Sequence, residues 1–326
     1  MKLTANRRTL FKLGMAGATA LAAPQILVRA AQADVKMPDV ENPGFSRFRL
    51  GDFEVTTLRD GGRAGDGPHP TFGANQDPEA VAELLEANFL PADRFVNSFT
   101  PTLVNTGSEL ILFDTGLGEG AREGGLGRLA AQLAASGYAP DDVSIVVLTH
   151  FHGDHIGGLT EGGNPAFANA RYVAGQAEYD FWTAPERMTG PTENAAKTVE
   201  SKVKPLADKM TFIGDGDAVA PGISAMMAAG HTPGHMIFML DSGGKQLVLT
   251  ADTANHYVAS LQRPDWHVAF DMDKDMAAAT RQRILGMIAA ERLPFIGYHM
   301  PFPALGYLEA MDEGFRWVPE TYQMQL

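Results

Sequence analysis

The sequence predicts one α+β domain in which two mixed β-sheets carry helices on their outer sides. Strand-like segments followed by helix-like segments occur in the first half of the chain, and the same order occurs again in the second half. No linker rich in proline, glycine or serine divides residues 34–326, so we expect these residues to form a single domain. With 326 residues, 45% of them hydrophobic, the chain has enough apolar material for one large core.

Residues 1–33 differ from the rest of the chain in composition. They contain no acidic residue, carry Arg7-Arg8 ahead of a modest apolar run, and end in the small residues Ala31-Gln32-Ala33. This pattern predicts a twin-arginine-type signal peptide and export to the periplasm. A retained membrane anchor is the alternative. Because two glycines and a proline interrupt the apolar run, no stable membrane insertion is expected.

In the first half of the chain, turn residues between alternating segments predict two hairpins, over residues 45–59 and 102–114. A helix is expected to begin at Asp77-Pro78, because aspartate is a common N-cap and proline fits the first helical turn. The other expected elements are a helix at 126–135, strands at 145–149 and 171–174, and helices near 178–182 and 195–206.

In the second half, Gly243-Gly244 is expected to turn the chain between two of three consecutive strands, which are predicted at 223–227, 235–240 and 246–250. A long helix is predicted from about 274 to 290. Its expected buried face consists of Ile284, Leu285, Met287 and Ile288. Pro294 ends this helix, a strand follows at 295–298, and residues 314–318 form a last extended piece.

The charge and the lack of cysteine exclude several functions. Without the five basic residues of the predicted signal, 21 basic and 39 acidic residues remain, a net charge of −18. Such a surface repels nucleic acid, so no nucleic-acid partner is expected. The chain contains no cysteine, which excludes disulfides, a thiol nucleophile and an iron–sulfur cluster. A metal ion would be held by nitrogen and oxygen atoms.

The stretch His150-Phe151-His152-Gly153-Asp154-His155 directly follows a short apolar strand. It places four potential metal ligands within six residues. Imidazole and carboxylate suit divalent ions such as Zn²⁺. Two histidines and an Asp-His pair together offer more ligands than one tetrahedral ion can use. A surface cluster of histidines without metal is the alternative. It is disfavoured because three of the nine histidines of the chain fall in this one window.

Further polar residues stand at the ends of predicted strands or in tight turns. Asp114, Asp252 and His299 each follow a strand, and His235 closes the turn Gly230-His231-Thr232-Pro233-Gly234-His235. Each of them alone has the character of an ordinary loop residue. Their combination with the first motif predicts a common site.

Together these pieces, with Phe113-Asp114-Thr115-Gly116, resemble the metallo-β-lactamase superfamily, and they occur in the order of that family. Four other segments resemble its methyl parathion hydrolase-like branch, which includes organophosphate hydrolases and lactone or aryl-ester hydrolases. They are Val104-Asn105-Thr106-Gly107, Gly127-Arg128-Leu129-Ala130, Phe181-Trp182 and Gly314-Phe315-Arg316-Trp317-Val318-Pro319. The resemblance implies an αββα sandwich with two divalent metal ions, zinc being the expected metal, at one edge of the sheets.

The resemblance also implies a ligand set. One ion would be held by His150, His152 and His235. The other would be held by Asp154, His155 and His299, with Asp252 bridging both. Asp114 would orient the ligands from behind. His231, in the turn before His235, is expected to bond the backbone rather than a metal.

The implied activity is hydrolysis of a lactone or an aryl ester by a hydroxide that bridges the two ions, with organophosphate triesters as a side activity. Asp252 and Asp154 are the expected catalytic carboxylates, and Asp154 or Tyr257 would pass a proton to the leaving group. Trp182, Tyr257 and Phe302 are expected to line the pocket of a small-molecule ester. The related branch also suggests a homodimer.

Three alternatives differ in their chemistry. A β-lactamase shares the first motif, but the branch most similar to this chain lacks the bridging aspartate. A mononuclear iron persulfide dioxygenase would contain one iron ion. A non-catalytic metal-binding protein would hold two ions and cleave no ester.

Overall fold

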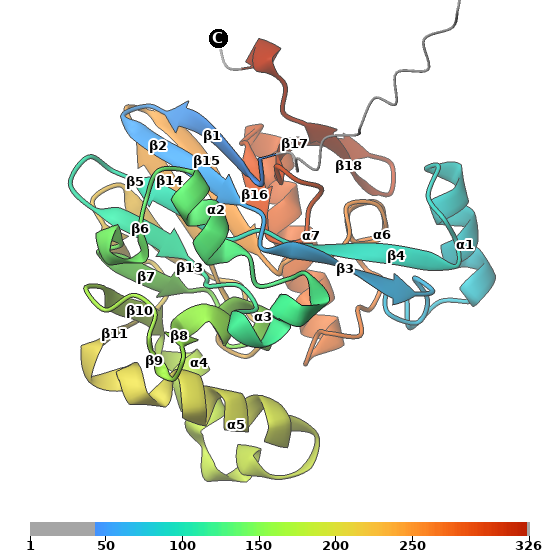
Figure 1. The fold of residues 1–326 in the computed structure, drawn as a ribbon. Helices are drawn as coiled ribbons and strands as arrows, with labels where there is room; N and C mark the ends of the chain where they lie inside the picture. Colours follow the sequence, from blue (N-terminus) through green and yellow to red (C-terminus); the bar gives the residue numbers. More distant parts are fainter. Residues whose placement is uncertain (1–42, 325–326) are drawn as a thin grey trace, which may run out of the picture. The chain divides into compact units, whose positions relative to one another are not determined.

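The computed structural model describes residues 43–324 (Figure 1). The predicted signal peptide, residues 1–33, lies outside the described residues. Within residues 43–324 the chain forms two seven-stranded mixed sheets, with helices packed against their outer faces. This arrangement confirms the predicted α+β fold. No helix among these residues is long and apolar enough to cross a membrane.

The first sheet is buried on both faces. Ile145 and Val147 point toward the second sheet, whereas Val146 and Leu148 pack with the helices on the outer side. This explains why the strand reads as a continuous apolar run. In sheet order its strands are β1 (Phe45–Leu50), β2 (Phe53–Leu58), β5 (Thr102–Asn105), β6 (Leu110–Phe113), β7 (Ile145–Leu148), β10 (Arg171–Gly175) and β11 (Met210–Ile213).

The second sheet carries the long helix α7 (Lys274–Glu291), which buries Ile284, Leu285 and Ile288 as predicted and Met287 in part. In sheet order its strands are β12 (Ala218–Ala220), β13 (Ile223–Met227), β14 (Met236–Ser242), β15 (Lys245–Ala251), β16 (Phe295–Gly297), β17 (Leu305–Met311) and β18 (Gly314–Pro319). The sequence did not predict β17, because its leucines, glutamate, alanine and methionine are good helix formers.

Two short hairpins lie outside the large sheets. One pairs β3 (Gly61–Asp66) with β4 (Arg94–Phe99), and the other pairs β8 (Thr160–Glu161) with β9 (Asn164–Pro165). Strand β3 escaped prediction because three of its six residues are glycine, which is depleted in strands. Figure 1 shows β3 and β4 extending away from the two large sheets toward α1.

The remaining helices are short. Helix α1 (Pro78–Ala87) begins after Asp77 as predicted, although the Asp77 side chain forms no capping hydrogen bond. The others are α2 (Leu129–Ala135), α3 (Gly153–Ile156), α4 (Gln176–Thr183), α5 (Glu193–Lys202), α6 (Ala259–Gln262) and the 3₁₀ turns Glu119–Gly124, Pro140–Asp142, Gly157–Leu159, Pro185–Met188, Gly190–Thr192, Lys204–Lys209 and Tyr322–Met324.

The topology brings the predicted site residues together. Strands β6 and β7 run parallel, and so do β15 and β16, so the carboxyl ends within each pair lie at the same edge of its sheet. Asp114, the 150–155 motif, Asp252 and His299 all follow these ends. One edge of the sandwich therefore carries polar side chains from both sheets.

Candidate metal centre

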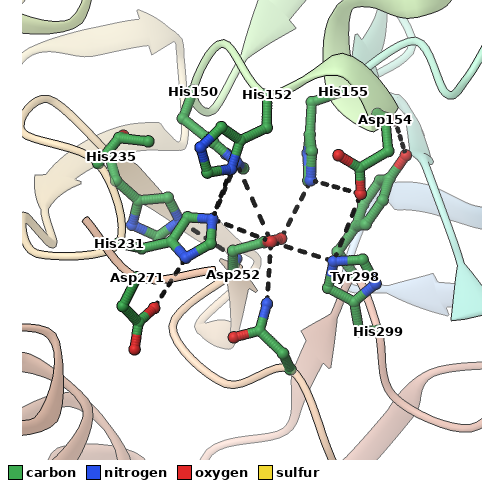
Figure 2. A network of polar contacts seen from close by, with 12 residues as sticks. His150, His152, Asp154, His155, His231, His235, Asp252, Asp271, Tyr298 and His299 are labelled. Carbon is green, nitrogen blue, oxygen red and sulfur yellow. Dashed lines mark hydrogen bonds and ion pairs between the residues drawn. The ribbon is translucent and has the colours of Figure 1, made fainter. Parts of the chain in front are cut away.

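Polar side chains from four loops converge at this edge, with the Asp252 carboxylate between two groups of histidines (Figure 2). In the first group, the Nε2 atom of His231 lies 3.2 Å from Nε2 of His150 and 2.9 Å from Nδ1 of His152. In the second group, Oδ2 of Asp154 lies 3.6 Å from the Nε2 atoms of both His155 and His299.

Asp252 contacts both groups. Its Oδ2 atom lies 3.2 Å from Nε2 of His231 and 3.0 Å from Nε2 of His299, and its Oδ1 atom lies 3.1 Å from Nε2 of His155. Asn255 donates its amide to Oδ2 at 3.0 Å, which fixes the orientation of the carboxylate. Asp252 therefore lies where the sequence predicted a bridging group.

Four rings of the cluster are oriented through their Nδ1 atoms. Each Nδ1–H donates to an acceptor outside the cluster, which leaves Nε2 facing Asp252. The pairs are His150 with Thr149 Oγ1 at 3.0 Å, His155 with Asp114 Oδ2 at 2.8 Å, His231 with Asp271 Oδ1 at 2.9 Å, and His299 with the Ser98 carbonyl at 2.7 Å. Asp114 thus orients His155 as the sequence analysis expected, and it also accepts from Thr149.

The structure reverses the predicted places of His231 and His235. His235 uses both ring nitrogens on the backbone: Nδ1 donates to the Ala228 carbonyl at 2.9 Å, and Nε2 accepts from the Asp252 amide at 3.1 Å. No lone pair of His235 is left for an ion. His231 instead completes the group with His150 and His152. The two histidines stand four residues apart in one turn, and the sequence alone carries no signal for which of them faces the cluster.

The electrostatics of the cluster favour positive charge at its centre. Burial lowers the pKa of all its imidazoles, and His150 and His152 stay well below the ordinary value. At His231 the carboxylates of Asp252 and Asp271 outweigh burial and raise the pKa to about 9. Carboxylates also outweigh burial at the other two histidines. Asp252, Asp114 and Asp154 raise the pKa of His155, and Asp252 and Asp154 raise that of His299. Burial would raise the pKa of Asp252, but the charges of His299, His155 and His231 hold it well below its usual range.

The donor set fits divalent ions. Asp252 Oδ1 and His155 Nε2 are buried and lie 3.1 Å apart, but neither forms a hydrogen bond of good geometry, which is costly unless another group satisfies them. The neutral rings of His150 and His152 offer lone pairs, and the carboxylates stabilise added positive charge. Ions held between these nitrogen and oxygen atoms would satisfy both requirements.

A cavity of about 750 Å³ opens onto this cluster at His152, Asp154, His231, Asp252 and His299. Much of its outer wall is apolar, formed by Phe95 and Phe99 on β4 together with Leu117 and Phe270. Arg63 on β3 and Asn97 on β4 add polar groups. The cavity suits a small molecule with one polar and one apolar end.

None of the three residues predicted to line the pocket does so. Trp182 is buried, and its indole nitrogen donates to Glu178 at 2.8 Å. Tyr257 stacks on His256 and packs against the core, which also removes it as a proton donor at this cavity. Phe302 lies before Pro303 in the β16–β17 loop. Aromatic residues next to recognised motifs were expected to form the wall, whereas much of it comes from the unpredicted hairpin of β3 and β4.

Three buried charged residues near the site were also missed. Asp271 holds His231, Arg281 holds Asp271 at 2.7 Å, and Glu178 contacts two of the ligand loops. All three lie in segments that read as ordinary helix or loop surface, where charged residues are common. No pattern in the sequence distinguished them.

Comparison with known proteins identifies relatives of this chain. An N-acyl homoserine lactonase from Bacillus cereus is 25% identical over 172 residues, which are 52% of this chain and 62% of the relative. N-acyl homoserine lactonase AttM from Agrobacterium fabrum is 28% identical over 130 residues, 38% of this chain and 46% of the relative. The matched part of this chain thus spans less than two thirds of the length of these relatives.

Two solved structures share the fold closely. AidC, a dizinc quorum-quenching lactonase in complex with the product N-hexanoyl-L-homoserine, has a TM-score of 0.75 and 27% identity, covering 86% of this chain and 98% of that chain. The hydrolase AbOPH of the β-lactamase superfamily has a TM-score of 0.79 and 27% identity, covering 87% and 99%. The family model of the metallo-β-lactamase superfamily matches residues 100–290. Since this is more than half of the sequence and includes most of the cluster, the chain belongs to the metallo-β-lactamase superfamily, as the sequence motifs predicted.

Proposed function

We propose that the protein is a binuclear metal-dependent hydrolase that opens lactones, with zinc as its metal. The observation that supports this most directly is the position of Asp252 between two groups of potential ligands, with its buried Oδ1 atom 3.1 Å from His155 Nε2 but in no well-formed hydrogen bond. His150, His152 and His231 would hold one ion, and Asp154, His155 and His299 the other. Asp252 would contact both.

Bound divalent ions would supply Lewis acidity at the ester carbonyl and lower the pKa of water, so that a nucleophile forms near neutral pH. The chain's own residues orient the substrate. Phe95, Phe99 and Phe270 give its apolar part a surface to bind, while Arg63 and Asn97 offer hydrogen bonds to its polar part.

Hydrolysis adds water to the acyl carbon, breaks its bond to the leaving oxygen and requires a proton on that oxygen. The Asp154 carboxylate lines the cavity and is partly exposed, so it can carry a proton between the attacking water and the leaving oxygen. In a lactone, both products stay in one molecule. We propose Asp154 for this transfer and Asp252 as the carboxylate that positions the reacting groups.

The lactone is favoured as substrate by the relatives, which include N-acyl homoserine lactonases and a dizinc lactonase with its product bound. Aryl esters share the same carbonyl chemistry and fit the aromatic cavity wall. Organophosphate triesters are proposed as a side activity, because their P–O bond is open to the same nucleophile.

Export to the periplasm is a separate proposal that is supported by the arginine pair and the apolar run of residues 1–33. Cell fractionation tests it: the full chain should accumulate in the periplasm, and the R7K/R8K variant in the cytoplasm. Equal distribution of both would contradict export. A homodimer is proposed as the assembly, and light scattering at the mass of one chain would contradict it.

A measurement of metal content followed by a substrate panel tests the activity. Purified protein should hold two zinc ions per chain, hydrolyse lactones faster than aryl esters or phosphotriesters, and be inactive toward β-lactams. Chelation should abolish the activity, and zinc should restore it. Full activity after complete metal removal would refute the proposal, as would two bound ions without activity on any ester.

A further inference from the structure

Glu178, on the first turn of α4, is a fully buried carboxylate outside the metal cluster. Both of its oxygens accept two hydrogen bonds. Oε1 accepts from the Phe151 amide at 2.9 Å and from the indole nitrogen of Trp182 at 2.8 Å. Oε2 accepts from the hydroxyl of Thr232 at 2.7 Å and from the Gly234 amide at 2.9 Å. One side chain therefore has four donors and no acceptor around it.

These partners belong to two loops that carry ligands. Phe151 lies between His150 and His152, whereas Thr232 directly follows His231. The two loops are about 80 residues apart in the chain, yet the Nε2 atom of His231 must meet the rings of His150 and His152. Among the described residues, Glu178 is the side chain that hydrogen-bonds the backbone of both loops.

The packing around Glu178 is shaped for this contact. A Cβ atom on Gly234 would lie 2.1 Å from the Glu178 backbone nitrogen, so only glycine allows the turn to approach α4 so closely. The Trp182 side chain lies one helical turn further on, and its ring contacts that of His152 edge-on, with centroids 6.1 Å apart. Helix α4 thus touches the first ligand group on one side.

We propose that Glu178 is a positioning residue that sets the distance between the 150–152 loop and the 231–235 turn, and so tunes the affinity of the ion held by His150, His152 and His231. Because all four partners are donors, only the ionised carboxylate satisfies them all. Burial raises the pKa of Glu178, and the four hydrogen bonds oppose that rise. The buried negative charge also lies close to a site that favours cations.

The inference rests on the proposed metal centre, and E178Q tests it. The glutamine is isosteric, but its amide nitrogen must face two donors on one side, so one loop loses its anchor. We expect E178Q to bind one of two ions about 10- to 100-fold more weakly in a chelator competition. We also expect the absorption spectrum of the cobalt-substituted protein to change, because the ligand geometry differs.

The control is D60N. Asp60 is another fully buried carboxylate that accepts backbone N–H groups, from Leu117 at 2.9 Å and Leu129 at 2.8 Å, but neither belongs to a ligand loop. D60N should lower thermal stability and leave both the metal affinity and the cobalt spectrum unchanged. If Glu178 has a purely structural role, E178Q should likewise lower thermal stability and leave the metal affinity and the cobalt spectrum unchanged.

Two outcomes overturn the inference: E178Q binds both ions with the affinity of the unmodified protein, or its cobalt spectrum is the same. If E178Q does not fold, T232V removes one hydrogen bond between Glu178 and the 231–235 turn, and an unchanged cobalt spectrum of T232V then overturns it. Failure of the unmodified protein to bind two ions would instead refute the proposed function, so the two failures are distinguishable.

Discussion

The Nε2 atom of His231 lies 2.9 Å from the Nδ1 atom of His152, although 79 residues separate the two histidines in the chain. His235, four residues further on, holds the backbone at Ala228 and Asp252 instead. A single turn therefore gives two histidines different roles. One faces the cluster, and the other supports the strand end that presents Asp252.

Replacing each histidine by alanine should separate these roles. H231A should lose one of the two ions and reduce turnover by more than about 100-fold, the upper range for residues that only support a ligand. H235A should keep both ions but be less stable by about 1–3 kcal/mol, because a buried carbonyl and a buried amide lose their partners. Elemental analysis and denaturant unfolding measure the two effects. If H235A lost an ion and H231A kept both, the assignment of His231 as the metal ligand would be contradicted.

Asp252 should control the protonation of its neighbours in metal-free protein. Burial lowers the pKa of His231, but the charge of Asp252, together with Asp271, outweighs burial and raises this pKa to about 9. In D252N the pKa of His231 should therefore fall, so the ring loses its proton at a lower pH than in the unmodified protein. NMR titration of metal-free samples measures this change. An unaltered titration would mean that Asp271 alone sets the pKa of His231.

Asp271 and Arg281 should behave as a coupled pair. Their side chains are fully buried and joined at 2.7 Å, and Arg281 also donates to the carbonyls of Thr253, Pro264 and Trp266. D271N leaves a buried guanidinium without its counter-ion and should cost about 3–5 kcal/mol of unfolding free energy. The D271N/R281M double variant should cost less than the sum of the single variants. Additive costs in a double-mutant cycle would show that the pair is not coupled.

His256 should make the protein sensitive to acid. Its Nδ1 atom accepts the Val258 and Ala259 amides at the start of α6, and burial lowers its pKa from 6.5 to about 4. Because the folded value lies below the unfolded one, the unfolded chain takes up the proton first. This contribution is complete above pH 6.5 and is lost as the pH falls toward 4, with a size on the order of 3 kcal/mol.

The H256N variant keeps an acceptor for these amides but does not titrate. In metal-free protein, its unfolding free energy should fall less between pH 8 and pH 4.5 than that of the unmodified chain. Equal losses for both proteins would assign the acid sensitivity to other groups.

The cavity wall should determine substrate binding more than turnover. Phe95 lines the cavity but belongs to neither ligand group, so F95A removes apolar contact area and KM for apolar substrates should rise about 5- to 30-fold with little change in kcat. V96A is the matched control, since Val96 is the next residue on β4 and points to the other face, where it is 68% exposed. A fall in kcat without a change in KM would show that Phe95 affects the reaction itself.

Much of the fold could be predicted from the sequence, because buried strands are apolar runs bounded by turn residues and helix α7 carries the apolar group Ile284, Leu285 and Ile288 on its buried side. The ligand positions Asp114, Asp252 and His299 could also be found, since each directly follows such a strand and topology then gathers them. Glycine-rich β3 has no side chains that form a pattern, so the hairpin and its cavity wall were not predicted.

The exchange of His231 and His235 had a different cause. Which of two histidines faces the cluster depends on the local turn and on partners far away in sequence, such as Asp271 on one and Ala228 on the other. Likewise, Trp182 was predicted to line the pocket, but its indole nitrogen donates to the buried carboxylate of Glu178, which keeps the side chain in the core. Contacts of this kind become visible when the chain is folded.

The hairpin of β3 and β4 is hydrogen-bonded to the metal cluster through the backbone carbonyl of Ser98, which accepts from His299, and Phe99 packs edge-on against the same imidazole. Any amino acid supplies such a carbonyl. Mutations in the hairpin can therefore diversify substrate preference during evolution while the ligand set stays the same. For enzyme engineers, a library confined to this hairpin, with Phe99 kept, would explore new specificities at little risk to the reaction centre.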